Sequence, residues 1–231
     1  GDSSRFYEQS LYKHGWSCFK QGFYPEGIES FLTLMDRKLG GYSEAESLAV
    51  IENLSRADRE LFEDTLRVMS IAFSYEDGPD SIRSYVASHN SSGYAYFLYQ
   101  GLAELYLEKE RYIDAASVCE AFAIDYPAHY EAPVFQSLAI AAYRTAGFPS
   151  LVLESKMAYV GTYGLTADYW AHWQPEARPE VIAELKVNLS DLAQYQHSRA
   201  QQGNDAEAYV AAALWYRTYI DHFPDDPEVV E

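Results

Sequence analysis

The sequence predicts an all-α fold of about eleven helices. Apolar residues recur at i, i+3, i+4 and i+7 over most of the chain, the spacing that places them on one face of a helix. No stretch shows the sustained apolar–polar alternation of a half-buried strand. Prolines separate the periodic segments, because proline cannot donate a helical hydrogen bond; they are Pro25, Pro79, Pro127, Pro133, Pro149, Pro179 and Pro224.

The predicted helices pair, in chain order, into about five units. These units cover residues 5–38, 56–89, 96–128, 129–164 and 179–224. Two insertions interrupt them: residues 39–54 should hold a short extra helix behind the turn GGYS, and residues 164–178 form a long connection. The first helix of the last unit is long, from Pro179 to about Gln202, and the turn GNDAE follows it. We expect the five units to form one array.

The third unit carries the clearest motif. Its residues follow the spacing W-x2-L-G/A-x2-Y, then Y-x2-A, then a closing proline, with Tyr99, Leu102, Ala103, Tyr106, Tyr112, Ala115 and Pro127 in these places. The small residues Ala103 and Ala115 let two antiparallel helices approach closely, and the large rings fill the space beside that contact. Phe122 departs from the pattern, because it occupies a late position that is usually small.

By this spacing the chain resembles the tetratricopeptide repeat (TPR) superfamily over nearly all its length. The period agrees, since 34 residues separate Ser81 from Ala115. The matching positions in the other units are Leu11, Gly15, Gly22, Tyr24, Gly27 and Phe31, then Ser81, Tyr85 and Ser88, then Ala139, Gly147, Leu151 and Ala158, and finally Ala212, Tyr216, Tyr219 and Pro224. The resemblance implies a right-handed superhelix, a TPR solenoid, whose first helices line a concave groove.

Three phrases look most like long bacterial cell-envelope TPR proteins: LYKHGWSCFKQGFYPEGIESF, LYLEKERYIDAA and WYRTYIDHFPDDPE. This likeness of style implies a periplasmic or outer-membrane-associated protein, and a cytoplasmic location stays open. The chain opens GDSSRFYEQ without a leader pattern and stops at HFPDDPEVVE, so we expect a piece of a longer protein. Its C-terminal end should then expose apolar surface, through which a crystal dimer could form.

The TPR resemblance places a partner-binding groove on the first helices. The groove positions are Gln9, Tyr12, Trp16, Phe19 and Lys20, then Glu63, Leu66, Ser70, Phe73 and Ser74, then Phe97, Gln100, Glu104, Leu107 and Glu108, and then Gln136, Ile140, Tyr143 and Arg144. Among them we take as candidate contacts Tyr12, Trp16, Phe19, Phe73, Gln100, Glu104, Gln136 and Tyr143. Only Lys20 and Arg144 are basic, so a clamp for a peptide's C-terminal carboxylate is not expected. The alternative is that these aromatic rings pack on the next repeat.

The second insertion is rich in aromatic residues. Within YGLTADYWAHWQPEARPE lie Tyr169, Trp170 and Trp173, rigid rings of the kind that bind a partner at little entropic cost. We treat these three residues as a second candidate contact site. The alternative is a loop folded under its own rings.

The chain is strongly acidic. It has 17 Lys+Arg against 35 Asp+Glu, which gives a net charge of −18 and a pI near 4.6. A nucleic acid would meet net repulsion and little counterion release, and an anionic membrane would repel the chain as well. No apolar run approaches the roughly 20 residues of a membrane-spanning helix. The expected partner is therefore a neutral to basic protein or peptide.

No catalytic or metal-binding pattern stands out. The six histidines are scattered, and the chain has no H-E-x-x-H, C-x2-C or G-x-S-x-G motif and no glycine-rich phosphate loop. Cys18 and Cys119 lie among apolar neighbours in helical patterns, which favours two small buried hydrophobes. We therefore expect no enzyme, no metal and no cofactor.

Two function hypotheses follow. The favoured one is a non-enzymatic scaffold that binds a protein or peptide in its groove within a bacterial cell-envelope assembly. The alternative is a superhelical module of a polysaccharide or peptidoglycan machine that contacts glycan through its aromatic rings. The 21 tyrosines bear on both hypotheses. Repeat positions account for part of them, and the remainder, including Tyr12, Tyr143, Tyr163 and Tyr169, is where we expect function.

Overall fold

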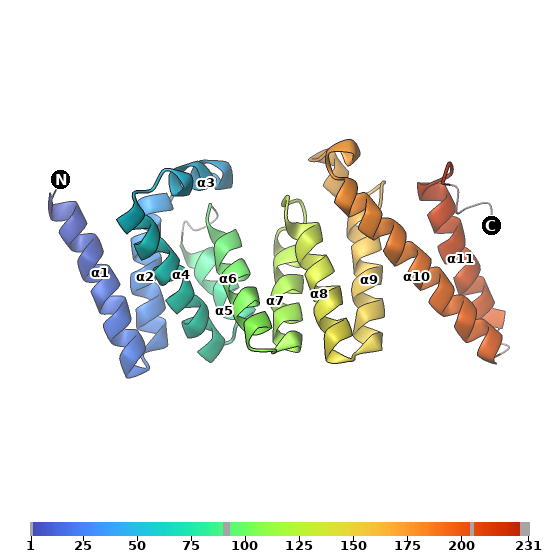
Figure 1. Ribbon diagram of the computed structural model, residues 1–231, viewed down its shortest axis with the longest axis horizontal. Coiled ribbons are helices and arrows are strands. Elements are labelled where there is room, and N and C mark those ends of the chain that lie inside the picture. Colours follow the sequence, from blue (N-terminus) through green and yellow to red (C-terminus); the bar gives the residue numbers. More distant parts are fainter. Residues whose placement is uncertain (1, 90–92, 204–205, 227–231) are drawn as a thin grey trace. The chain divides into compact units, whose positions relative to one another are not determined.

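The computed structural model of the protein describes residues 2–89, 93–203 and 206–226. Within these ranges the chain forms eleven α-helices and two short 3-10 helices, and no strand (Figure 1). The all-α prediction and its number of helices are confirmed. Contacts divide the chain into two compact units, unit 1 (Gly1–Ala121) and unit 2 (Phe122–Glu231), which are described here one at a time.

The helices match the expected ranges to within a few residues. Unit 1 holds α1 (Asp2–Gln21), α2 (Tyr24–Leu39), α3 (Glu44–Glu52), α4 (Arg56–Tyr75), α5 (Pro79–Ser88) and α6 (Ala95–Glu108), and α7 (Tyr112–Asp125) crosses into unit 2. Unit 2 holds α8 (Ala132–Ala146), α9 (Pro149–Tyr163), the 3-10 helices η1 (Asp168–Ala171) and η2 (Pro175–Ala177), α10 (Pro179–Gly203) and α11 (Ala206–His222). Helix α3 is the short helix expected in the first insertion. A single TPR superhelix over both units stays a prediction.

Two glycines allow the close approach of α1 and α2. A Cβ atom on Gly27 would lie 3.2 Å from the carbonyl oxygen of Gly15, and a Cβ atom on Gly15 would lie 2.7 Å from the ring of Phe31. Phe31 is completely buried, so its ring has no free space to move into. The glycines in the small positions of the first predicted unit are therefore the reason that the two helices touch.

The turns after α1 and α8 are built in the same way. Gly22 and Gly147 adopt the left-handed conformation, with φ of +80° and +79°. The next backbone N–H, of Phe23 or Phe148, reaches back to the carbonyl five residues earlier, which closes a Schellman motif. A proline then sits in the first turn of the following helix, where its missing N–H costs nothing.

Helix α11 packs on α10 with one face and exposes apolar residues on another. The packed face contains the small buried residues Ala208 and Ala212. Val210 and Leu214 on this helix are exposed by 71% and 63%, and an association through the C-terminal end stays a prediction.

Replacing one glycine with alanine should separate packing from helix propensity. Gly15→Ala should destabilise unit 1 by about 1–3 kcal/mol, because the added methyl overpacks the buried ring of Phe31. Gly161→Ala in α9 is the control, since a Cβ atom there meets nothing within 4 Å. It should stabilise the protein by about 0.5–1 kcal/mol through helix propensity alone. Urea unfolding followed by circular dichroism measures both changes, and a Gly15→Ala protein as stable as the wild type would contradict this account of the contact.

Candidate functional site

The strongest candidate site in unit 1 is a hollow between α4 and α6, which we call the acidic hollow. Its volume is about 320 Å³, and its lining consists of Glu63, Leu66, Arg67, Ser70, Phe97, Gln100, Gly101, Glu104, Leu105 and Glu108. The two helices can approach closely behind it because a Cβ atom on Gly101 would lie only 2.6 Å from the hydroxyl oxygen of Ser70. The apolar lining residues Leu66, Phe97 and Leu105 are half-buried and form the floor of the hollow. The carboxylates of Glu63, Glu104 and Glu108 are exposed and form its rim.

The charges around the acidic hollow are unbalanced. Three exposed carboxylates, those of Glu63, Glu104 and Glu108, lie on its lining, against the one guanidinium of Arg67. That guanidinium is already paired with Asp64 at 2.5 Å. Glu104 accepts a hydrogen bond from the Gln100 amide at 3.0 Å, which orients its carboxylate. Glu108 pairs with Lys109 at 3.6 Å, so the negative charge that remains on the lining is that of Glu63 and Glu104.

Much of this lining was predicted from repeat spacing. The predicted groove positions that line the acidic hollow are Glu63, Leu66, Ser70, Phe97, Gln100, Glu104 and Glu108. Gly101, Leu105 and Arg67 were missed, because the repeat rule counts only the positions that face straight into a groove. Leu105 and Arg67 also line a second hollow of about 540 Å³, where Lys109 and Arg111 add positive charge.

The aromatic candidates on α1 build a polar contact with α4. The Tyr12 hydroxyl donates to Asp64 at 2.5 Å, and the Trp16 indole N–H donates to the same carboxylate oxygen at 3.0 Å. Phe19 packs edge-on against Trp16, with ring centroids 5.7 Å apart. Burial opposes ionisation of Asp64, but these donors outweigh it and lower the pKa of its carboxyl. Tyr12, Trp16 and Phe19 are half-buried, so their rings pack within unit 1 more than they project into solvent.

Three candidate contacts turn out to be core residues. Phe73 is completely buried in unit 1. In unit 2, Tyr143 is buried, and the buried Gln136 donates to the hydroxyl of Ser155 on α9 at 2.6 Å. The expectation that these side chains face a groove is therefore wrong. Helix α5 contributes Tyr85 beside Phe73, and α9 contributes Ser155 beside Gln136, contacts that repeat spacing within one helix cannot show.

The aromatic insertion folds under its own rings. The Trp170 N–H donates to the Tyr163 carbonyl at 3.0 Å, and the Trp173 N–H donates to the Ala128 carbonyl at 2.8 Å. Tyr169 and Tyr163 are buried, and burial raises the pKa of Tyr169 to about 12. These contacts agree with the second interpretation of the insertion, a loop folded under its own aromatic rings.

A buried arginine holds the insertion in place. Arg178 is 1% exposed, and its guanidinium carbon lies 3.5 Å from the ring centroid of Tyr130. It donates to the Tyr130 carbonyl at 2.6 Å, to the carboxylate of Glu180 at 2.5 Å and to the hydroxyl of Tyr169. The sequence contains no signal for this contact, because Arg178 lies in an irregular segment without periodicity.

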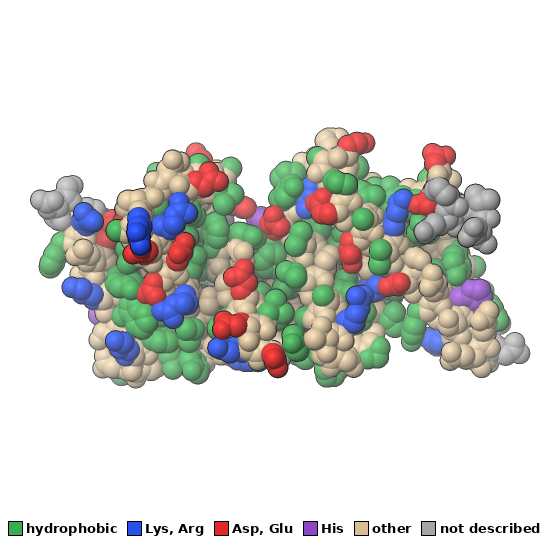
Figure 2. All heavy atoms as spheres, in the orientation of Figure 1, with side chains coloured by type: hydrophobic (Ala, Val, Ile, Leu, Met, Phe, Trp, Pro, Cys, Tyr) green, Lys and Arg blue, Asp and Glu red, His purple; other side chains and the backbone are tan. Residues whose placement is uncertain are grey.

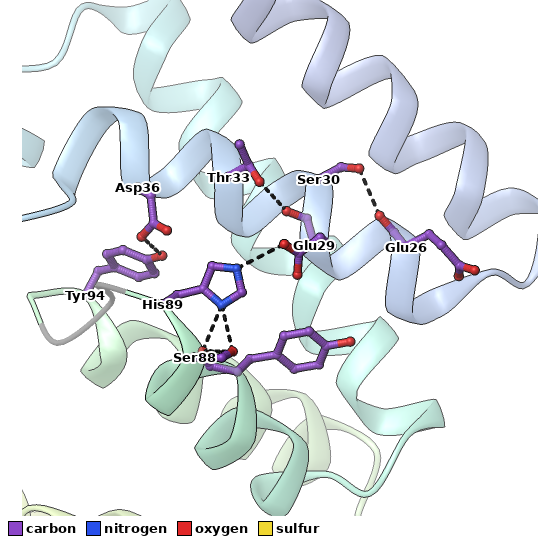
Figure 3. Close-up of polar contacts among 9 residues, drawn as sticks. Glu26, Glu29, Ser30, Thr33, Asp36, Ser88, His89 and Tyr94 are labelled. Carbon is purple, nitrogen blue, oxygen red and sulfur yellow. Dashed lines mark hydrogen bonds and ion pairs between the residues drawn. The ribbon is translucent and has the colours of Figure 1, made fainter.

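A histidine–carboxylate contact joins the end of α5 to α2 (Figure 3). The His89 Nε2 atom lies 3.2 Å from the Glu29 carboxylate, and Nδ1 lies 3.0 Å from the carbonyl oxygen of Tyr85. Both ring nitrogens thus face oxygen acceptors, which favours the doubly protonated ring. Burial alone would lower the pKa of His89, but the Tyr85 carbonyl and Glu29 outweigh it and raise the pKa.

This cluster resembles a serine–histidine–glutamate triad only in its residue types. Ser88 Oγ lies 3.0 Å from His89 Nδ1. Nδ1 also lies 3.0 Å from the Tyr85 carbonyl, to which Ser88 donates at 3.0 Å. The serine hydroxyl is therefore already used in a hydrogen bond to the backbone, and Nε2 lies against Glu29. The arrangement is a structural contact between α5 and α2.

The described residues contain no group of three His, Cys, Asp or Glu side chains able to hold a metal ion. Cys18 and Cys119 are both free and buried, as expected, and burial raises the pKa of Cys119 to about 12. A thiol with so high a pKa is a poor nucleophile at neutral pH. None of the helices in the described ranges is both long and apolar enough to cross a bilayer.

Comparison of the chain with profiles of known protein families, with curated proteins and with solved structures finds no match. The TPR resemblance therefore rests on residue spacing and on the paired helices. It stays a prediction.

Arg178 should matter more for stability than any exposed arginine. Arg178→Ala should destabilise unit 2 by about 2–4 kcal/mol, because the Tyr130 carbonyl and the Tyr169 hydroxyl lose their charged donor and keep only the 3.4 Å hydrogen bond between them. Arg199→Ala on the exposed side of α10 is the control and should change stability by less than about 0.5 kcal/mol. Chemical unfolding compares the two variants. Equal effects would show that the buried guanidinium does not hold the insertion.

The His89–Glu29 contact should stabilise unit 1 only at acidic pH. A histidine whose pKa is raised in the folded state contributes stability below its unfolded pKa of 6.5, and this is lost as the pH rises through the folded value. A double-mutant cycle with His89→Gln and Glu29→Gln should give a coupling below about 1 kcal/mol near pH 5.5 and almost none near pH 8.5. A coupling that is constant over this range would contradict the ion pair.

Proposed function

We propose that the chain is a non-enzymatic TPR-type scaffold that binds an extended protein or peptide segment at the acidic hollow of unit 1. The observation that carries this proposal is the excess of exposed carboxylates over an apolar floor between α4 and α6. A bound segment would place a lysine or arginine head near Glu63 and Glu104, where charge-assisted hydrogen bonds are strong. Its aliphatic stem would lie on Leu66 and Phe97.

The charge of the whole chain supports a neutral to basic partner. Figure 2 shows acidic and basic side chains interspersed with hydrophobic ones on the displayed face, so local contacts and not the net charge of −18 alone must select a partner. A basic segment would still be drawn toward the protein at low salt, because long-range attraction raises the association rate. Nucleic acids and anionic membranes carry the wrong charge for this surface.

The cellular setting is part of the same proposal. The likeness of three sequence segments to bacterial cell-envelope TPR proteins supports a periplasmic or outer-membrane-associated scaffold. The glycan-binding alternative relied on aromatic rings open to a sugar. The insertion's Trp170 and Trp173 direct their N–H groups to backbone carbonyls of the chain itself, which leaves this alternative with less support than peptide binding.

Binding of a basic peptide should depend on the hollow's carboxylates. As a probe we suggest a fluorescein-labelled peptide that alternates leucine and arginine. The double variant Glu63→Gln, Glu104→Gln should weaken its binding by at least about tenfold, because charge-assisted hydrogen bonds are lost. Glu52→Gln, which removes an exposed carboxylate of α3 away from the hollow, is the control and should leave the affinity unchanged.

Fluorescence anisotropy at two salt concentrations measures these affinities. The affinity of the wild type should fall as salt rises, because the contact is electrostatic and exposed. A peptide with glutamate in place of arginine should not bind. Equal binding of the two peptides, or of the double variant and the wild type, would refute the acidic hollow as the site.

A further inference from the structure

Unit 2 contains a buried lysine whose charge is not needed to pack the helices. Lys156 on α9 is 2% exposed, and its ammonium forms an ion pair with Asp191 on α10. Burying an ammonium is costly, and an apolar side chain of similar volume often stabilises a fold at least as well. An ammonium has three N–H donors, and Asp191 is its one hydrogen-bond partner among the described residues. Two donors are therefore available for another acceptor.

Lys156 lies on the wall of a hollow that we call the cationic hollow. This hollow has a volume of about 350 Å³, within the range of small-molecule sites, and lies between the α8–α9 turn and α10. Its other lining residues include Arg144, Phe148, Val152 and Tyr195. Two cations thus face one carboxylate, a positive excess in a chain whose net charge is −18.

The remaining wall favours an apolar ligand that carries one negative charge. Phe148 and Tyr195 leave 46% and 42% of their surface exposed, so their rings are open to a ligand. Arg144 is exposed and forms no side-chain contact with the described residues.

We propose that the cationic hollow binds a small organic carboxylate with an apolar body. The carboxylate accepts hydrogen bonds from Lys156 and Arg144, and the body lies against Val152 and between the rings of Phe148 and Tyr195. Acetate has the carboxylate but no apolar group, and an uncharged analogue has the apolar group but no carboxylate. Neither should bind well. This site lies in unit 2 and does not depend on peptide binding at unit 1.

Phenylbutyrate is a suitable probe, with phenylbutanol and acetate as matched comparisons. Isothermal titration calorimetry should show saturable binding of phenylbutyrate with one site per chain. Phenylbutanol should bind at least about tenfold more weakly, because it cannot make charge-assisted hydrogen bonds. Amide NMR shifts should concentrate at the start of α9 and the middle of α10. Equal affinities for the acid and the alcohol, or shifts located elsewhere, would overturn the proposal.

Two variants at exposed positions test the residues without removing buried packing. Arg144→Gln should weaken phenylbutyrate binding by about tenfold. Asp191→Asn should strengthen it, because the carboxylate that competes for Lys156 is removed. Since this leaves the buried ammonium without its partner, circular dichroism must first show that the variant keeps the wild-type fold. Arg217→Gln on α11 is the matched control and should have no effect. Unchanged affinity in both test variants would show that the bound acid does not use the cationic hollow.

Discussion

Close contact between paired helices at small residues is the constraint on which both units depend. In unit 1 the backbones of α1 and α2 meet at Gly15 and Gly27, and the buried ring of Phe31 fills the space that a side chain would otherwise take. In unit 2 the alanines of α11 serve the same purpose against α10. Large side chains fill the space beside these contacts, and many of the aromatic rings are buried there.

Polar contacts then connect the packed pairs to their neighbours. Asp64 joins α4 to two donors on α1, His89 joins α5 to α2, and Arg178 joins the insertion to the segment before α8. Two tyrosines that the sequence suggested as functional, Tyr163 and Tyr169, are buried and have their rings in contact. Arg178 donates to the hydroxyl of Tyr169, so this pair belongs to the packing of the insertion.

The two hollows have opposite chemical character on one acidic chain. The acidic hollow of unit 1 has more carboxylates than cations on its lining, whereas the cationic hollow of unit 2 contains Lys156 and Arg144 against Asp191 alone. An array of paired helices can vary in this way because the residues that hold each pair together differ from those that face solvent. The helix pairs provide the frame, and the residues on their exposed faces set the chemical character of each hollow.

Periodicity, proline positions and small residues determined the number of helices, their bounds and much of the acidic hollow. These features are local: helical spacing places Glu63 and Leu66 on one side of α4, and Gln100 and Glu104 on one side of α6. Tertiary structure decided the rest. Phe73 and Gln136 are buried, Arg178 is enclosed and Lys156 faces a hollow because of the element that lies across each of them. Burial depends on neighbours distant in sequence, and spacing within one helix contains no information about them.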